Sequence, residues 1–411
     1  MYYYQEENRR YASFEELPLP AAGPSADGPL TWLYSRPVQE SRASFAPADA
    51  RQLAATAEDV GWLDVRRMEK APPLPEEVRK CLASGTLRAV NAAHPRWREL
   101  AAAAPSHGRQ RVHILALGDV GSTILMALKL LGGEHISAIG ICDVNEKALQ
   151  RWEFEMNQVT YPWEYDRLPP VEIVPREEIF RCDVFCFAAS RGIPPVGAAV
   201  EDVRMAQFAA NRELVESYAR QARQDGFHGL FAVISDPVDP LAKAALLSSN
   251  LDENGQYDGM GLLPEQIQGF GLGVMNARAA YYARKEKRFA SFLQEGRAFG
   301  PHGRGLVIAN SVEHYDDALS RELTALALGA NLKMRELGFK PYAAPALSSA
   351  ALSLLLAMEG AWHYSSVFLG GVYLGVKNRF TPYGVETETL PLPDALFERL
   401  QETERELRSI I

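Results

Sequence analysis

The sequence is poor in cysteine, with four among its 411 residues. No two of them form a Cys-x-x-Cys pair, and no group of histidines and cysteines has the spacing of a metal site. We therefore predict neither a disulfide framework nor a metal centre, and expect reduced, buried thiols in a reducing compartment. The cysteines are Cys81, Cys142, Cys182 and Cys186.

Long runs of basic residues and long apolar runs are also missing. The formal net charge is -9, and an acidic chain repels phosphate backbones, so nucleic acid is a poor candidate partner. The most apolar stretch, 343–358, contains Pro345 and several serines and is too short to cross a bilayer. The first residues show neither a basic nor an apolar segment, so we expect no secretory signal. These absences predict a cytoplasmic protein without membrane partners.

The remaining composition is that of a globular protein, with 47% hydrophobic residues. Three regions are predicted from changes in rhythm: an extension over 1–108, a nucleotide-binding domain over 109–268 and a catalytic domain over 269–411. The extension carries no catalytic motif. We interpret it as a cap that packs on the rest or supports oligomerisation.

Apolar runs alternate with helical stretches after residue 108, which is typical of a doubly wound parallel sheet. Strands are predicted at 112–117, 138–142, 171–174, 183–188 and 230–235. In the last third, helices are expected over 271–294, 321–337, 346–358 and 394–411, with a strand over 368–376. The predicted fold class is α/β, a Rossmann-type domain followed by an α+β domain.

The strongest local motif is a glycine turn that follows the first of these strands. It runs Ala116-Leu117-Gly118-Asp119-Val120-Gly121 and opens a helix. Gly118 lets a pyrophosphate approach the backbone, Gly121 permits close helix–strand contact, and the helix start supplies free N–H groups. Asp143, 22 residues after Gly121, ends the next strand and suits a ribose 2′-hydroxyl. The unit predicts a dinucleotide site that prefers NAD over NADP.

From about Arg111 onward the chain resembles the NAD-dependent lactate/malate dehydrogenase family. The matching motifs follow in the family's order: the glycine turn with Asp143, Ala188-Ala189-Ser190, Arg204 with Asn211, Ser235-Asp236-Pro237-Val238-Asp239, Gly273-Val274-Met275-Asn276-Ala277-Arg278 and Gly300-Pro301-His302-Gly303. By this resemblance, residues Gly118 to Gly121, Asp143, Ala188, Ser190 and Asn211 bind NAD.

The resemblance also implies a catalytic histidine, His302, as the base that takes a hydroxyl proton. The family orients this ring with an aspartate, whereas Asn276 stands at the matching position here and is one candidate partner, because an amide can orient the ring although it cannot stabilise its charge as a carboxylate does. Asp236 stands where the family has an asparagine that touches the substrate. We hypothesise that Asp236 has become the carboxylate partner of His302, which requires the two side chains to lie within about 6 Å. The alternative is that Asp236 only satisfies a turn before Pro237.

Three arginines are candidates for substrate contacts. Arg204 matches the family's carbonyl-polarising position, or is a solvated helix residue. Arg278 stands one position away from the family's carboxylate clamp, so either it reaches the site through a local irregularity or the clamp is lost. Arg191 begins a loop in which Gly192 and Gly197 are candidate hinges of a lid.

The predicted function is an NAD-dependent oxidoreductase that transfers a hydride between NAD and a 2-hydroxy or 2-oxo acid or a related small molecule. The resemblance implies a homodimer or homotetramer. The alternative is a catalytically degenerate NAD-binding sensor or scaffold. An NAD-dependent glycosidase ranks last, because no cysteine accompanies His302 to hold the metal which that chemistry needs.

Overall fold

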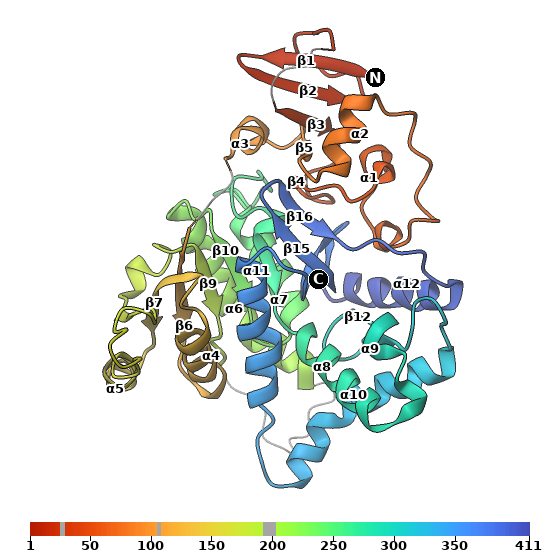
Figure 1. The fold of residues 1–411 in the computed structure, drawn as a ribbon. Helices are drawn as coiled ribbons and strands as arrows, with labels where there is room; N and C mark the ends of the chain where they lie inside the picture. The colour runs from red at the N-terminus through yellow and green to blue at the C-terminus, as the bar shows by residue number, and fades with distance from the viewer. Residues whose placement is uncertain (25–28, 105–107, 192–202) are drawn as a thin grey trace.

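A computed structural model describes residues 1–24, 29–104, 108–191 and 203–411, with only the backbone of 203–206 (Figure 1). Six parallel strands form one side of a nine-stranded sheet, in the order β11-β10-β9-β6-β7-β8 with β8 at the edge. This is the Rossmann strand order, so the predicted fold is confirmed. The strands are β6 (Gln110–Leu115), β7 (Ile136–Cys142), β8 (Val171–Ile173), β9 (Val184–Phe187), β10 (Leu230–Val233) and β11 (Ile267–Gly269).

The strands are continuous apolar runs because both faces of the sheet are covered. In β9, Val184 and Cys186 belong to the core on one face, and Phe185 and Phe187 to the core on the other. The first face carries α4 (Asp119–Leu131), α5 (Glu146–Asn157), the π-helix η5 (Pro345–Ala351) and α11 (Leu352–Met358). The second carries α6 (Val203–Gln224) and α7 (Val238–Ser249), and the short η2 (Arg176–Glu178) lies between β8 and β9.

Antiparallel strands from the last third extend the same sheet beyond β11. They are β14 (His363–Leu369), β15 (Val372–Thr381) and β16 (Gly384–Thr387). The single strand predicted over 368–376 is wrong, because Gly370 and Gly371 have φ values of 53° and 94° and reverse the chain within it. Glycine adopts this left-handed backbone without a steric penalty.

Shorter elements surround the end of the sheet. They are η3 (Pro264–Gln266), α8 (Leu272–Lys285), η4 (Lys287–Phe289), α9 (Phe292–Glu295), β12 (Arg297–Phe299), β13 (Val307–Ala309), α10 (Asp317–Glu336) and α12 (Asp394–Arg408). The helix predicted over 271–294 is thus divided into α8, η4 and α9, since the backbone N–H of Glu286 closes α8 on Tyr282 and Glu286 itself is extended. The helix predicted over 346–358 begins as the π-helix and continues as α11.

Residues 1–104 form a second sheet at the N-terminal end of the molecule (Figure 1). Its strand order is β1-β2-β3-β5-β4. The strands are β1 (Tyr2–Glu6), β2 (Arg9–Ser13), β3 (Leu30–Tyr34), β4 (Ser44–Phe45) and β5 (Arg88–Asn91), accompanied by α1 (Ala50–Ala54), η1 (Val60–Leu63), α2 (Glu76–Ala83) and α3 (Trp97–Ala102).

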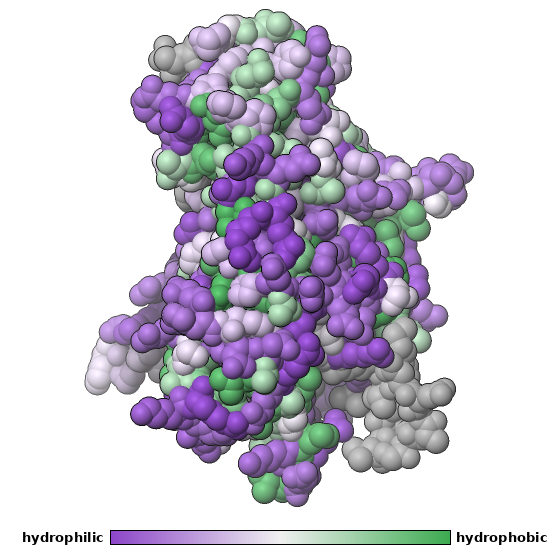
Figure 2. All heavy atoms as spheres, turned by 90° about the vertical axis from the view of Figure 1, so that its right-hand side faces the viewer, coloured by the Kyte–Doolittle hydropathy of each residue, from purple (hydrophilic) through white to green (hydrophobic). Residues whose placement is uncertain are grey.

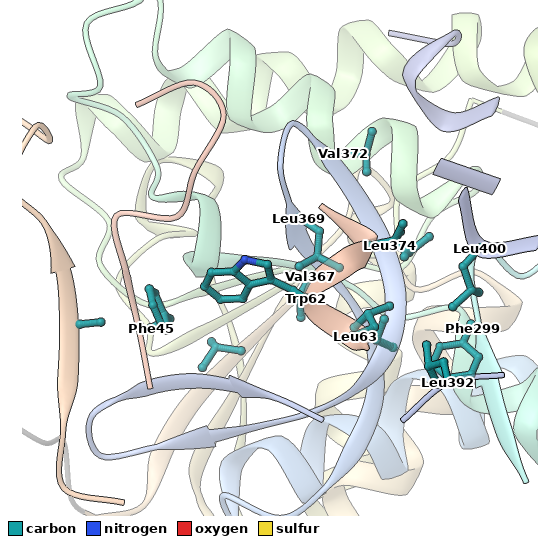
Figure 3. Packing of buried hydrophobic residues seen from close by; sticks show 14 of the residues in the cluster. Phe45, Trp62, Leu63, Phe299, Val367, Leu369, Val372, Leu374, Leu392 and Leu400 are labelled. Carbon is teal, nitrogen blue, oxygen red and sulfur yellow. The ribbon is translucent and has the colours of Figure 1, made fainter. Parts of the chain in front are cut away.

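This N-terminal sheet shares a hydrophobic core with the C-terminal strands. Figure 3 shows Phe45 and Trp62 beside Val367 and Leu369, which belong to β14. Polar contacts join the N-terminal sheet to η3 as well, since Glu265 accepts hydrogen bonds from the Ala43 N–H at 3.0 Å and the Ser44 hydroxyl at 2.7 Å. The core therefore crosses the predicted boundary at residue 108, and the division into three regions stays a prediction.

The surface of one face is mainly hydrophilic, with scattered hydrophobic side chains (Figure 2). Among the described helices, none combines the length and the apolar character that a membrane crossing requires. All four cysteines are free thiols. Cys142 and Cys186 are buried as expected, whereas Cys81 and Cys182 are only half-buried.

Candidate active site

A cavity of about 1500 Å³ lies at the carboxyl ends of β6, β7, β9 and β10. This is the place where doubly wound sheets bind their ligands. The chain between the end of α10 and the start of η5 completes its wall, together with the end of α12. The predicted site residues that line it are Gly118, Asp119, Val120, Gly121, Asp143, Ala188, Ser190, Asp236 and His302.

The glycine turn has the tight geometry that its sequence predicts. A Cβ on Gly121 would lie 1.9 Å from the carbonyl oxygen of Ala116, so only glycine fits between the turn and α4. A Cβ on Gly118 would meet no atom within 4 Å, and Gly118 directly precedes the first residue of α4. The backbone here is open to the cavity beside the free N–H groups of a thirteen-residue helix.

Ala116 occupies the first glycine position of the fingerprint and adopts a φ of 73°. This left-handed conformation is costly for a residue with a Cβ. The turn is therefore kept in spite of the alanine, at a local conformational cost.

Asp143 reaches the same cavity from the end of β7. Its two carboxylate oxygens accept hydrogen bonds from the N–H of Leu117 at 2.6 Å and of Asn145 at 2.9 Å. These bonds fix the carboxylate at the rim, and each oxygen keeps a lone pair for a further donor. The arrangement suits the hydroxyl groups of a ribose.

The structure places Asp236 and His302 next to one another. Asp236 Oδ1 lies 3.0 Å from His302 Nε2, well within the 6 Å that the pairing hypothesis requires. Such a contact requires a hydrogen on Nε2, and it stabilises a positive charge on the ring. On the opposite side of the ring, a Cβ on Gly271 would lie 2.7 Å from Nδ1, so glycine at 271 makes room for the imidazole.

Backbone contacts hold both members of this pair. The side-chain amide of Asn211 donates to the carbonyl of Asp236 at 2.8 Å, and its Oδ1 accepts from the N–H of Arg191 at 2.9 Å. The loop of His302 is attached at Gly300, whose N–H donates to Gly375, and at Gly305, whose carbonyl accepts from Thr403. Asn211, predicted to touch the cofactor, does not line the cavity and instead holds the backbone of Asp236.

A second carboxylate, Asp239, lies in the first turn of α7 and was not among the predicted site residues. Only 4% of the residue is exposed, yet it lines the cavity. Burial raises the pKa of this carboxyl to about 6, and the negative charge of Asp236 also raises it. The charge of His302 and a hydrogen bond from Ser366 lower the pKa and offset part of this rise. The motif Ser-Asp-Pro-Val-Asp contained the residue, but nothing in its spacing distinguished it from a structural helix cap.

The two predicted residues of α8, Asn276 and Arg278, do not line the cavity. Arg278 donates to the carbonyl of Ala327 at 3.4 Å and to Oδ1 of Asn331, so its guanidinium joins α8 to α10.

The remaining predicted arginines are placed only in part. Arg191 forms an exposed ion pair with Glu213 at 2.7 Å. Arg204 lies in α6, and its side chain is outside the described residues, as are the candidate hinges Gly192 and Gly197.

Further charged side chains line the cavity from positions that none of the quoted motifs includes. Lys340 contacts Asp119 in the glycine turn at 2.9 Å, and Arg304 contacts Glu406 of α12 at 3.2 Å. Their approach depends on contacts between distant parts of the chain, which a single sequence does not reveal.

The strand order defines an α/β protein of the Rossmann fold class, although no protein-family model matches the chain. An L-lactate dehydrogenase of Treponema denticola is 24% identical over 195 residues, which is 47% of this chain and 55% of that protein. The match thus spans about half the length of the curated relative.

Solved structures match over a larger part of the chain. An L-lactate dehydrogenase from Enterococcus mundtii has a TM-score of 0.59 at 18% identity, covering 74% of this chain and 97% of that one. A malate dehydrogenase from Archaeoglobus fulgidus, in complex with NADH, has a TM-score of 0.57 at 15% identity, covering 73% and 98%. The chain has the fold of the lactate and malate dehydrogenases, as its resemblance in sequence predicted.

Proposed function

We propose that this protein is an NAD-dependent dehydrogenase that acts on a CH–OH group, or on the corresponding carbonyl. One observation carries the proposal: a single cavity joins the glycine turn and Asp143 to the Asp236–His302 pair. The relatives named as lactate and malate dehydrogenases, one of them in complex with NADH, support it.

The residues of the turn fit a dinucleotide. The open backbone at Gly118 and the start of α4 would hold the pyrophosphate, and Asp143 would hold a ribose. A carboxylate at this position repels a 2′-phosphate, so NAD is the expected cofactor. When bound, NAD supplies the acceptor for the hydrogen and the electron pair of the C–H bond that breaks.

The Asp236–His302 pair accepts and donates the proton that the reaction transfers. In alcohol oxidation the O–H bond breaks, its electron pair forms the carbonyl, and the proton passes to the pair. Nε2 of His302 faces Asp236, whose side chain is 48% exposed, so Asp236 is the member of the pair that we assign to contact with the substrate hydroxyl. The charge of His302 stabilises the ionised carboxylate. In the reverse direction the pair returns this proton.

More narrowly, we propose that the substrate is a 2-hydroxy or 2-oxo acid. We also propose that the protein is cytoplasmic and forms a homodimer or homotetramer. Contacts by Arg204, Arg191 and Arg278 with the substrate also stay predictions. Ala188 and Ser190, which line the cavity at the end of β9, are proposed to border the cofactor.

The test is NADH binding and NAD reduction by the purified protein with a panel of alcohols. We expect micromolar NADH binding, measured by fluorescence, and an activity that falls at least a hundredfold in His302→Ala, since general acid–base groups contribute about 10²–10⁴-fold. His314→Ala is the matched control, because His314 is exposed and contacts Glu295 instead. Failure to bind NADH contradicts the proposal.

A second candidate is an NAD-binding sensor without catalysis. The engagement of Arg278 with α10 favours it, because this arginine would otherwise be the substrate clamp. Tight NADH binding without turnover of any alcohol in the panel identifies this function.

A further inference from the structure

A segment from the last third of the chain forms part of the cavity wall at the nucleotide end. Residues 338–342, which follow α10, all line the cavity together with the glycine turn. Gly338 has a φ of 85°, a left-handed conformation that glycine adopts without a steric penalty and that commonly ends a helix. The chain therefore turns at the end of α10 and continues along the cavity.

The packing of η5 determines where this segment lies. Ala346 and Ala350 of η5 belong to the same buried core as Ile124 and Leu128 of α4. The N–H of Ala346 also donates to the carbonyl of Tyr342 at 3.0 Å, which joins the segment to the start of η5. Apolar packing between η5 and α4 thus holds the segment beside the nucleotide end.

Lys340 is the residue of this segment that contacts the glycine turn. Its Nζ lies 2.9 Å from Oδ2 of Asp119, the first residue of α4. Asp119 directly follows Gly118, beside which a Cβ would meet no atom within 4 Å. A cation from 221 residues further along the chain therefore lies where the pyrophosphate of NAD is expected.

The charge of Asp119 creates a need for this cation. A carboxylate in the glycine turn repels a pyrophosphate and competes with it for the positive end of α4. The ammonium of Lys340 offsets both effects.

The ion pair is also weak enough to share its ammonium with a ligand. The side chains of Lys340 and Asp119 are 79% and 48% exposed, and exposed ion pairs contribute little to stability. An ammonium has three N–H donors, so a contact with Asp119 leaves donors for a phosphate oxygen. Lys340 can therefore contact a bound phosphate without leaving the glycine turn.

We propose that Lys340 binds the pyrophosphate of the cofactor, and that Asp119 positions its ammonium at the glycine turn. The inference rests on the proposed dehydrogenase function, which assigns the pyrophosphate to the start of α4. It extends the cofactor site to a segment that lies outside the glycine-turn motif. One cation then joins the ligand, α4 and the segment after α10.

NADH binding to the full-length protein, measured by fluorescence, tests this proposal. We expect Lys340→Gln to weaken NADH binding about tenfold, because a hydrogen bond between charged groups is lost. The variant should unfold at the denaturant midpoint of the wild type, since the ion pair is exposed. Equal NADH affinities of the variant and the wild type overturn the proposal and leave the dehydrogenase function intact.

Lys333→Gln is the matched control. Lys333 is an exposed lysine of α10 that does not line the cavity, so its replacement removes the same charge from the same region of the chain. We expect NADH binding to be unchanged. A tenfold loss in this variant as well overturns the proposal, because it would assign the effect to net charge.

A second background separates phosphate binding from simple neutralisation of Asp119. Asp119→Asn removes the negative charge, while an amide oxygen can still accept a hydrogen bond from the ammonium. Lys340→Gln should weaken NADH binding about tenfold in this background too, because the contact with the phosphate is still lost. A loss that disappears in the Asp119→Asn background overturns direct binding of the phosphate.

Two fragments of the cofactor provide a further measurement. ADP and adenosine differ only in the phosphates, and both can compete with NADH. Lys340→Gln should weaken ADP binding about tenfold and leave adenosine binding unchanged. An equal loss for both fragments overturns the proposal. Failure of the wild-type protein to bind NADH contradicts the dehydrogenase function, and this inference with it.

Discussion

The two ends of the cavity use their polar groups in different ways. At the nucleotide end, Asp143 is held by backbone N–H groups, and the turn from Gly118 to Gly121 leaves open backbone for a ligand. At the reaction end, side chains contact one another, with Asp236 on His302 and Asp239 behind them. Binding at the nucleotide end therefore depends on the shape of the backbone, whereas the chemistry at the reaction end depends on the balance of charge between side chains.

This difference explains how each end departs from the lactate and malate dehydrogenase motifs that the sequence resembles. The nucleotide end keeps its turn even though Ala116 replaces a glycine, because its function is set by the path of the chain. At the reaction end, single side chains determine the chemistry. The carboxylate at 236 and the contacts of Arg278 with α10 therefore concern the chemistry of the site and leave the fold intact.

The largest effect is expected from Gly121→Ala. Its Cβ would lie 1.9 Å from the carbonyl oxygen of Ala116, which the turn has no room to accommodate. We expect a loss of about 3 kcal/mol in the free energy of unfolding and loss of NADH binding.

Gly118→Ala is the matched control for the turn. Its Cβ meets no atom within 4 Å, so stability should change by less than about 0.5 kcal/mol while NADH binding weakens, because the methyl group points into open space at the cavity. Equal destabilisation by the two variants, measured by denaturant unfolding, contradicts this account of the turn.

The next effect is a dependence of stability on pH that is removed by Asp239→Asn. The folded pKa of about 6 lies above the reference value of 3.8, so ionising Asp239 costs the folded state free energy. This cost is absent below about pH 4 and complete above about pH 6, where it reaches about 3 kcal/mol.

The free energy of unfolding of the Asp239→Asn variant should therefore gain on that of the wild type as the pH rises from about 4 to about 7. His302, Asp236 and Ser366, the groups that face Asp239, are retained in both proteins. A difference that stays constant over this pH range shows that burial of Asp239 does not control the charge of the site.

Arg278→Gln should lower stability without changing substrate preference. The guanidinium contacts Asn331 and Ala327, so its removal should cost about 2 kcal/mol in unfolding free energy. The ratio of kcat/KM for 2-hydroxy acids to that for neutral alcohols should be the same with and without this change. A loss of activity confined to the 2-hydroxy acids would show that Arg278 turns into the cavity when a ligand binds.

The smallest effect is a gain in stability from Ala116→Gly. Glycine relieves the strain of a φ of 73°, and the greater freedom of glycine in the unfolded chain offsets part of the gain. We expect about 0.5 kcal/mol of added stability. Ala127→Gly, within α4, is the control and should destabilise by about 1 kcal/mol. Loss of stability in both variants would show that the turn does not strain Ala116.

The parallel sheet and the glycine turn were predictable because their information is local. A buried strand such as β9 is a continuous apolar run, and Gly118, Gly121 and Asp143 are spaced by one strand–turn–helix–strand unit. The closeness of Asp236 and His302 is not local information, because 66 residues separate them in the chain. It could be predicted only from the resemblance to a known family.

The rest depends on contacts between distant segments. The N-terminal sheet pairs short strands whose partners follow long connections, and its core is completed by β14 and β15. The burial of Asp239 and the contact of Lys340 with Asp119 arise only when α7 and the segment after α10 have packed. The direction of Arg278 was open for the same reason, because it is decided by α10.

A crystal structure with bound NADH tests most directly whether the two ends form one site. We expect the pyrophosphate against the start of α4, and the nicotinamide placed so that a carbon held at Asp236 would lie about 3–3.5 Å from the ring. A nicotinamide directed away from Asp236 and His302 would contradict the account.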